Sequence, residues 1–184
     1  MLGDKVKVQA KVESGYTDEQ LLAIVQMGIR HVYVLFRDED ANYDAVMRFR
    51  ERLDRFGLVA LDAGNTHLYK SDKIHLALEG RDEAIEAYNN FNIILGKAGI
   101  PVVYMTWEPN QVLTTRFAEG EHTRGGIGRI VELDELRARP YTHGRLYTKD
   151  EIWENFKYFL DRALPVCEEN HLKIALHPND PPVD

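Results

Sequence analysis

The residues of this chain that are best suited to chemistry each follow a short apolar run of the sequence. They are Asp62 with His67, the segment from Tyr104 to Glu108, and His177 with Asp180. In parallel α/β folds the ligand binds at the carboxyl ends of the strands, so side chains in these positions are expected to meet on one rim. Imidazole and carboxylate groups are ligands for several divalent cations, and their spacing here selects none of them.

His177 is the strongest single candidate, because it follows Ile174-Ala175-Leu176 directly and precedes a proline-rich turn. Asp62 and His67, taken alone, are better explained as hydrogen-bonded loop residues, and no two candidates form a complete ligand motif such as His-Glu-x-x-His. The other histidines fall at expected strand starts, loops or a helix end, where side chains commonly face solvent, and no role is assigned to them. They are His31, His75, His122, His143 and His171.

Amphipathic helices alternate with short apolar strands along the chain. Apolar spacing, with capping boxes at Thr17 and Thr148, predicts helices over about 18–27, 46–56, 82–98 and 148–170. Runs of β-branched and aromatic residues predict strands over about 6–9, 31–36, 58–61, 101–105 and 173–176. Pro165 lies inside the last helix, where proline removes a backbone donor, so a kink or a break before Val166 is expected.

This order of elements predicts a parallel sheet covered by helices, closed as a barrel or open as a doubly wound sheet. The open sheet usually has a glycine-rich phosphate turn after its first strand, and Lys11 to Gly15 contains no G-x-G-x-x-G. The glycine-rich stretch 125–128 follows no strand and is interpreted as a flexible loop. We therefore predict the α/β class and a (β/α)8 TIM-barrel type, present as a partial barrel of about five parallel strands in a single domain, 1–184. Since a full barrel has eight strands, either a partner chain closes it or the chain is a fragment.

One connection is much longer than ordinary loops between a strand and a helix. Residues 107–147 separate the fourth strand from the last helix, and loops of this length are usually lids or binding elements. The segment holds six arginines and six acidic residues, so its net charge is near zero. One or two of the arginines could fold inward and bind a carboxylate, for which the planar guanidinium is well shaped. A lid over the binding face is therefore expected.

The 184 residues carry a formal net charge of -7 and no block of like charge. Nucleic-acid affinity comes from clustered Lys and Arg, so a nucleic-acid partner is not expected. The first residues lack the pattern of a signal peptide, and no apolar run approaches the roughly 20 residues of a membrane span. A cytoplasmic protein with no membrane partner is expected. The single cysteine, Cys167, is interpreted as a small core residue.

Several segments of the chain resemble the mannonate dehydratases. The resemblance is closest over 153–160, 165–166 and 175–182, and weaker around 65–69, 103–107 and Arg116. It corresponds to the amino-terminal half of the family's pattern. The resemblance implies a xylose-isomerase-like TIM barrel that dehydrates D-mannonate to 2-dehydro-3-deoxy-D-gluconate, with Mn2+ or Fe2+, in hexuronate breakdown such as glucuronate catabolism. A small sugar acid is then the expected partner, and a homo-oligomer the expected assembly.

Matched position by position, the resemblance implies that His177 is a metal ligand and that His67, Tyr104 and Arg116 contact the substrate. Asn179 stands where the family pattern commonly has aspartate, which removes one negative charge beside the metal. The family's other metal ligands and its acid/base pair are expected in later strands, beyond Asp184, so no catalytic residue is assigned and the isolated chain is expected to be inactive. Two alternatives stay open: a sugar isomerase or epimerase on the same barrel, and an inactive half-barrel that serves binding or assembly.

Overall fold

Parallel strands and the helices that connect them form the body of the molecule. The computed structural model describes residues 7–109, 112–120, 123–178 and 180. None of the helices in these ranges is long and apolar enough to cross a lipid bilayer. In chain order the elements are β1 (Gln9–Glu13), α1 (Asp18–Gln26), β2 (His31–Leu35), the 3-10 turn η1 (Asp38–Asp40), α2 (Tyr43–Arg55), β3 (Val59–Gly64), α3 (Thr66–Tyr69), α4 (Asp72–His75), α5 (Arg81–Lys97), β4 (Val102–Thr106), β5 (Arg116–Ala118), β6 (Gly128–Ile130), α6 (Leu133–Arg137), α7 (Lys149–Glu169) and β7 (Lys173–His177).

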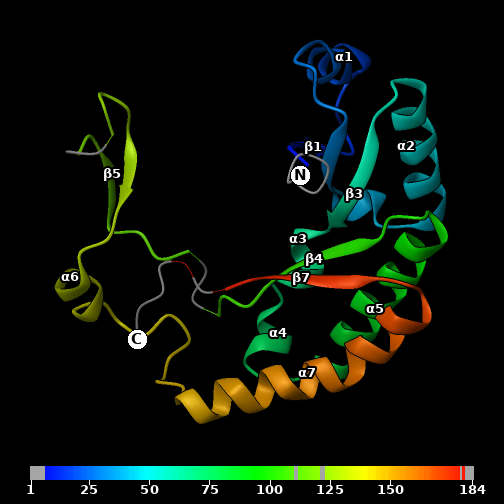
Figure 1. Ribbon diagram of the computed structural model, residues 1–184. Coiled ribbons are helices and arrows are strands. Elements are labelled where there is room, and N and C mark those ends of the chain that lie inside the picture. The colour runs from blue at the N-terminus through cyan, green and yellow to red at the C-terminus, as the bar shows by residue number, and fades with distance from the viewer. Residues whose placement is uncertain (1–6, 110–111, 121–122, 179, 181–184) are drawn as a thin grey trace, which may run out of the picture.

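The main sheet has the strand order β1-β2-β3-β4-β7. Every neighbouring pair in it is parallel. A doubly wound sheet reverses its order at a switch point, whereas this sheet continues in one direction. The long helices α2, α5 and α7 lie on the same side of the sheet (Figure 1). A one-directional parallel sheet with its helices on one face is the arrangement of a barrel wall.

The core lies between the sheet and its helical layer. Val32 and Val103, from β2 and β4, are almost completely buried. Tyr88 of α5 and Phe159 of α7 form an edge-to-face pair whose ring centroids lie 5.2 Å apart. Cys167 is 1% exposed in the same layer, which confirms its interpretation as a core residue. Apolar side chains buried between the strands and the helices therefore hold the sheet in place, and with it the strand ends that carry the candidate site.

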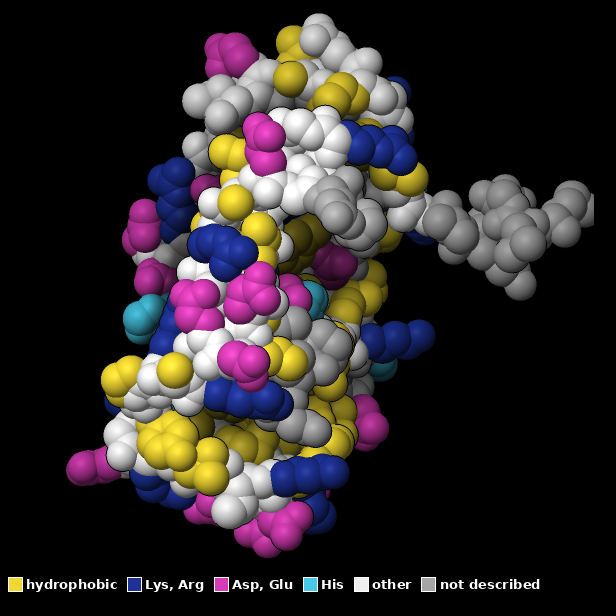
Figure 2. Space-filling view, turned by 90° about the vertical axis from the view of Figure 1, so that its left-hand side faces the viewer, with side chains coloured by type: hydrophobic (Ala, Val, Ile, Leu, Met, Phe, Trp, Pro, Cys, Tyr) yellow, Lys and Arg dark blue, Asp and Glu magenta, His cyan; other side chains and the backbone are white. Residues whose placement is uncertain are grey.

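The long connection between β4 and α7 forms a small arm, defined here as residues 112–120 and 123–147. Within it β5 and β6 pair in antiparallel fashion, and α6 follows. The arm stands away from the sheet in Figure 1, and basic and acidic side chains are interspersed over the face seen in Figure 2. Some of these charges pair within the arm, as Arg137 does with Asp134 at 3.6 Å.

The first strand begins later than the apolar pattern predicted. It was expected over 6–9, whereas β1 starts at Gln9 and pairs with β2 along its whole length. Val8 is 71% exposed, while Val12 is fully buried. The prediction was wrong because this edge strand buries only one face, and the residues beside Val12 are the charged Lys11 and Glu13.

Three other local predictions also need correction. β3 extends beyond Asp62, which therefore lies inside the strand and not after it. α7 continues through Pro165 without the predicted break, since Phe159 and Cys167, on either side of the proline, are buried in the same core. Of the glycine-rich stretch, only Gly128 departs from the predicted loop, because it begins β6, while residues 125–127 lie outside any helix or strand.

α5 and the end of α7 approach each other closely at Gly96. A β-carbon added there would lie 2.7 Å from the backbone oxygen of Asn170 and 2.9 Å from its Cβ. We expect Gly96→Ala to lower the free energy of unfolding by about 1–3 kcal/mol, because the two helices must move apart. Helix propensity alone would raise it by about 1 kcal/mol, so the sign of the change in urea denaturation distinguishes the two effects.

Asn90→Ala is the matched control, since Asn90 is exposed on the same helix. This substitution is expected to change the free energy of unfolding by no more than about 0.5 kcal/mol. A Gly96→Ala protein as stable as the parent would contradict the close packing of the two helices.

A candidate metal and substrate site at the carboxyl edge of the sheet

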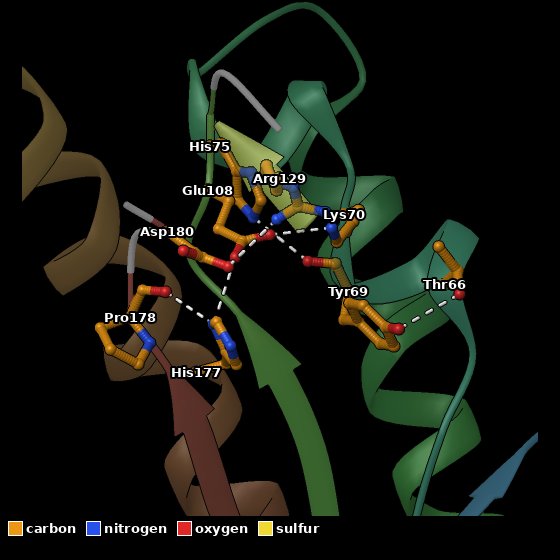
Figure 3. A network of polar contacts seen from close by, with 9 residues as sticks. All are labelled: Thr66, Tyr69, Lys70, His75, Glu108, Arg129, His177, Pro178 and Asp180. Atoms are coloured by element: carbon orange, nitrogen blue, oxygen red, sulfur yellow. Dashed lines mark hydrogen bonds and ion pairs between the residues drawn. The ribbon is translucent and has the colours of Figure 1, made fainter. Parts of the chain in front are cut away.

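His177 is the last residue of β7 and lies beside Thr106, the last residue of β4. Its side chain is 41% exposed, so the ring reaches the surface at the edge where the strands end. The ring nitrogen Nδ1 lies 2.7 Å from the carbonyl oxygen of Pro178 and 3.2 Å from Oε1 of Glu108. Figure 3 shows the ring between these two oxygens. His177 is thus placed at the predicted rim with one nitrogen already engaged.

Glu108 lies two residues beyond β4, and its side chain is only 1% exposed. Its second oxygen, Oε2, lies 2.8 Å from Nζ of Lys70. The two groups form an ion pair, but their orientation does not meet the geometry of a hydrogen bond. Lys70 follows α3, the short helix after β3. Three successive strand ends, those of β3, β4 and β7, therefore contribute to one charged cluster of Lys70, Glu108 and His177. The sequence placed Glu108 on this rim without a role, and Lys70 was not predicted.

Tyr104 of β4 lies next to this cluster. Its ring centroid is 6.3 Å from that of His177, and it also contacts Tyr33 and Tyr69, each with a centroid distance of 5.2 Å. Burial raises the pKa of Tyr104 above the ordinary value of 10.0, with smaller contributions from nearby Tyr69 and Glu108. The phenol therefore keeps its proton at neutral pH and can donate a hydrogen bond to a ligand.

The structure does not bring the other two predicted substrate residues into the cluster. His67 in α3 is 83% exposed, and its Nδ1 lies 3.6 Å from Oδ2 of Asp38. Arg116 in β5 lies on the arm, where it pairs with Glu132 at 3.2 Å and with Glu135 at 3.8 Å. A substrate role for His67 and Arg116 stays a prediction.

Two further predictions concern positions that the structure does not describe. Asn179, which stands where the family pattern commonly has aspartate, lies outside the described residues. Asp184, beyond which the acid/base pair and the remaining metal ligands are expected, lies outside them as well. The effect of Asn179 on the metal and the place of the acid/base pair beyond Asp184 therefore stay predictions, and no catalytic residue is assigned.

Asp62, another of the rim candidates, faces a different part of the sheet. Its Oδ2 accepts a hydrogen bond of 3.2 Å from Nε2 of Gln9 in β1, and its other oxygen is buried without a partner. Burial raises the pKa of Asp62, and the bond from Gln9 opposes this shift. Because Asp62 pairs with Val102, the first residue of β4, it lies toward the opposite ends of the strands from His177.

The arm meets the carboxyl edge through Asp180. Oδ2 of Asp180 lies 3.3 Å from a guanidinium nitrogen of Arg129 in β6, and its backbone oxygen accepts a hydrogen bond from the Leu113 backbone nitrogen. The pair of Arg129 and Asp180 lies beside Glu108 and His177 in Figure 3. An arginine of the arm is therefore held at the site. It is one of the six arginines that could fold inward, whereas the family resemblance had singled out Arg116.

His75 contradicts the expectation that it faces solvent. It is fully buried in α4, its ring centroid lies 4.5 Å from that of Trp107, and its Nε2 lies 3.2 Å from the backbone oxygen of Tyr69. Burial lowers the pKa of His75 to about 4, against weaker opposing contributions from its hydrogen bond and nearby acids. The expectation failed because it rested on the position of His75 along the chain, whereas its direct neighbours Ile74 and Leu76 are apolar and buried with it.

The buried His75 makes the protein sensitive to mild acid. The native ring resists protonation until about pH 4, whereas the ring in the unfolded chain takes up a proton near 6.5, so acidification between these values favours unfolding. We expect His75 to remove roughly 2 kcal/mol from the free energy of unfolding between pH 7.5 and pH 5.0. Urea denaturation of the parent and of His75→Phe at both pH values measures this difference.

Phenylalanine keeps an aromatic ring against Trp107 and does not titrate. The variant is expected to lose less stability on acidification than the parent, by roughly the same 2 kcal/mol, whatever its stability at pH 7.5. Equal losses in the two proteins would show that His75 is not kept neutral by the fold.

His177 offers a ring nitrogen that could bind a divalent metal ion. In His177 the two contacts to Glu108 and Pro178 both involve Nδ1, which leaves Nε2 as a possible ligand. Neutral imidazole suits Mn2+, Fe2+ and Zn2+. Within the described ranges no group of three or more histidine, cysteine or acidic side chains could hold a metal ion. His177 therefore has the chemistry of a metal ligand, and its role as one stays a prediction.

Sequence comparison relates the chain to one enzyme family. The family model described as D-mannonate dehydratase (UxuA) matches residues 130–184. A mannonate dehydratase from Thermotoga maritima is 30% identical over 173 residues, which cover 76% of this chain and 47% of the relative. One from Shouchella clausii is 27% identical, with 74% of this chain and 46% of the relative covered. The chain spans about half the length of the curated relatives that it matches.

Solved structures share the fold. The crystal structure of mannonate dehydratase from Streptococcus suis serotype 2 matches with a TM-score of 0.80 at 20% identity, covering 97% of this chain and 55% of that one. A D-psicose 3-epimerase from Clostridium cellulolyticum H10 matches with a TM-score of 0.58 at 12% identity, covering 93% of this chain and 52% of that one. At these identities the likeness shows the fold alone. It confirms the predicted xylose-isomerase-like TIM-barrel architecture, of which this chain forms a part.

Proposed function

Because this chain belongs to the mannonate dehydratase family, we propose that the natural gene product containing it dehydrates D-mannonate to 2-dehydro-3-deoxy-D-gluconate. The observation that carries the proposal is the family match over 130–184, which includes α7, β7 and His177. The placement of His177 at the carboxyl edge of a barrel-type sheet supports it, since enzymes of this fold bind their ligands there.

The reaction removes the proton on C2 of the sugar acid, next to the carboxylate, and the hydroxyl group on C3. The resulting enol becomes the 2-keto product, so atoms balance with the loss of one water. A bound divalent ion, Mn2+ or Fe2+, would polarise oxygens of the substrate and lower the cost of removing that proton. In this chain His177 would hold the ion through Nε2, while Glu108 and Pro178 hold the other side of the ring.

Tyr104, Arg116 and His67 are the proposed substrate contacts. Tyr104 supports this role best, because its protonated phenol lies beside His177 and can donate to a sugar oxygen. For Arg116 the proposal requires that the guanidinium leave Glu132 and bind the carboxylate of the substrate. The ion pair of Arg116 with Glu132 is half-exposed, and ion pairs at the surface are weak enough to be exchanged in this way. For His67 the proposal rests on its position after β3 and on the family pattern alone.

The wider assignments follow from the same proposal. The substrate class is a small sugar acid, the pathway is hexuronate breakdown, and the compartment is the cytoplasm. The arm would act as a lid over the carboxyl edge, to which the Arg129–Asp180 pair already connects it. A homo-oligomer is proposed as the assembly.

Product analysis tests the function. The natural gene product is incubated with D-mannonate and Mn2+, with and without EDTA, and the products are followed by NMR. We expect signals of a new methylene group at C3, and their loss when EDTA removes the metal. A product that retains all the atoms of the substrate would instead support the isomerase or epimerase alternative. Unchanged D-mannonate would support the inactive binding module.

A further inference from the structure

Glu108 carries a carboxylate that a substrate cannot reach. Its side chain is 1% exposed, and a buried carboxylate is costly unless it is paired. The two oxygens face different partners: Oε2 lies 2.8 Å from Nζ of Lys70, and Oε1 lies 3.2 Å from Nδ1 of His177. Lys70 thus fixes the orientation of the carboxylate from one side and leaves Oε1 directed at the histidine, as Figure 3 shows.

We propose that Glu108 is a positioning residue that holds the proton of His177 on Nδ1 and so presents the lone pair of Nε2 to a divalent metal ion. Nδ1 faces the carboxylate of Glu108 and the carbonyl oxygen of Pro178, at 3.2 Å and 2.7 Å. Both groups accept hydrogen bonds and neither can donate one, so the nitrogen between them must carry the proton. In a neutral imidazole the other nitrogen is then free to bind a metal.

The pairing with Lys70 makes Glu108→Gln an informative substitution. Lys70 can only donate, so the amide oxygen of the glutamine is expected to turn toward it. The amide nitrogen then faces His177 and offers a donor where the parent offers an acceptor. The variant therefore opposes a proton on Nδ1 and favours a proton on Nε2, the nitrogen that a metal would need.

The tautomer of His177 in the 184-residue chain is the direct test. Long-range 1H–15N NMR spectra of the histidine-labelled chain at pH 8.5 report which ring nitrogen carries the proton, and His177→Gln assigns the signal. We expect the proton on Nδ1 in the parent. In Glu108→Gln at least half of the molecules are expected to carry it on Nε2. The matched control is Glu154→Gln, at an exposed position on α7, which should leave the tautomer unchanged.

Two outcomes would overturn the proposal. One is a parent spectrum with the proton on Nε2, a result that does not require any Glu108 variant to fold. The other is a folded Glu108→Gln chain whose His177 keeps the parent tautomer, because the carbonyl of Pro178 would then be sufficient to fix the ring.

Titration with Mn2+ alone gives a second readout. In the natural gene product, Glu108→Gln is expected to weaken Mn2+ binding by about 10- to 100-fold, as loss of an outer partner of a ligating histidine usually does. Unchanged Mn2+ affinity would contradict the role of Glu108 at the metal.

The inference rests on the proposed function, and the two can fail separately. If the parent dehydrates D-mannonate while Glu108→Gln keeps both the tautomer and the Mn2+ affinity, the role of Glu108 is wrong and the function stands. If the parent does not dehydrate D-mannonate but the tautomer and the Mn2+ affinity change as expected, the function is wrong and the orienting role stands.

Discussion

Lys70→Met is expected to lower the free energy of unfolding by about 3 kcal/mol, because it leaves the buried carboxylate of Glu108 without its cation. The lysine is 20% exposed and the glutamate 1%, so water compensates little of the loss on the acidic side. Methionine keeps most of the volume of the lysine stem, so the change reports the missing charge more than missing packing. Urea denaturation at pH 7.5, followed by circular dichroism, gives the value.

Lys73→Met is the matched control for this experiment. Lys73 is exposed in the neighbouring helix α4, and its substitution should change stability by no more than about 0.5 kcal/mol. The double variant Lys70→Met with Glu108→Leu should recover much of the loss, since replacing both members of a buried ion pair with apolar residues is often neutral. A Lys70→Met protein within about 0.5 kcal/mol of the parent would show that the Glu108 carboxylate does not depend on Lys70.

His177→Ala is expected to lower kcat/KM for D-mannonate by at least about 10³-fold in the natural gene product, which corresponds to about 4 kcal/mol. The reason is that the proposed metal would lose a ligand at the point where the substrate binds. His177 is half-exposed and outside the buried core, so the free energy of unfolding should change by less than about 1 kcal/mol. Activity assays with Mn2+ in excess, together with urea denaturation, separate the two effects.

His171→Asn is the matched control for the catalytic prediction. His171 is exposed in the turn before β7 and has a positive φ of 59°, a conformation that asparagine tolerates better than alanine. The control should keep kcat/KM within about twofold of the parent, in line with a surface change away from the site. Loss of activity in both variants would point to the β7 region as a whole and not to the imidazole of His177.

Much of the fold could be predicted because its signals are local. Both capping boxes are present, with Thr17 at the start of α1 and Thr148 at the start of α7. Gly28, Gly57 and Gly99, which directly follow the last residues of α1, α2 and α5 and their C-caps, all have positive φ values, as glycines that end helices commonly do. Each of these features depends on residues within a few positions of one another, and the alternation of strand and helix follows from them.

The parts that were missed depend on contacts between distant segments. β5 and β6 are three-residue strands, too short for an alternating pattern to identify. The edge strand β1 is defined by its pairing with β2 and by one buried valine. The candidate site shows the same contrast between local signals and distant contacts. The predicted strand ends indicated the position of His177, whereas nothing in the sequence indicates that Lys70 and Glu108 form an ion pair.

His177 is proposed to bind a divalent metal ion through a ring nitrogen. The direct measurement is pulsed electron paramagnetic resonance of the Mn2+-loaded natural gene product, prepared with 15N-labelled histidine. A 15N coupling from metal-bound imidazole is expected in the parent, and it should decrease in His177→Gln and persist in His171→Asn. Identical couplings in the parent and in His177→Gln would contradict this proposal.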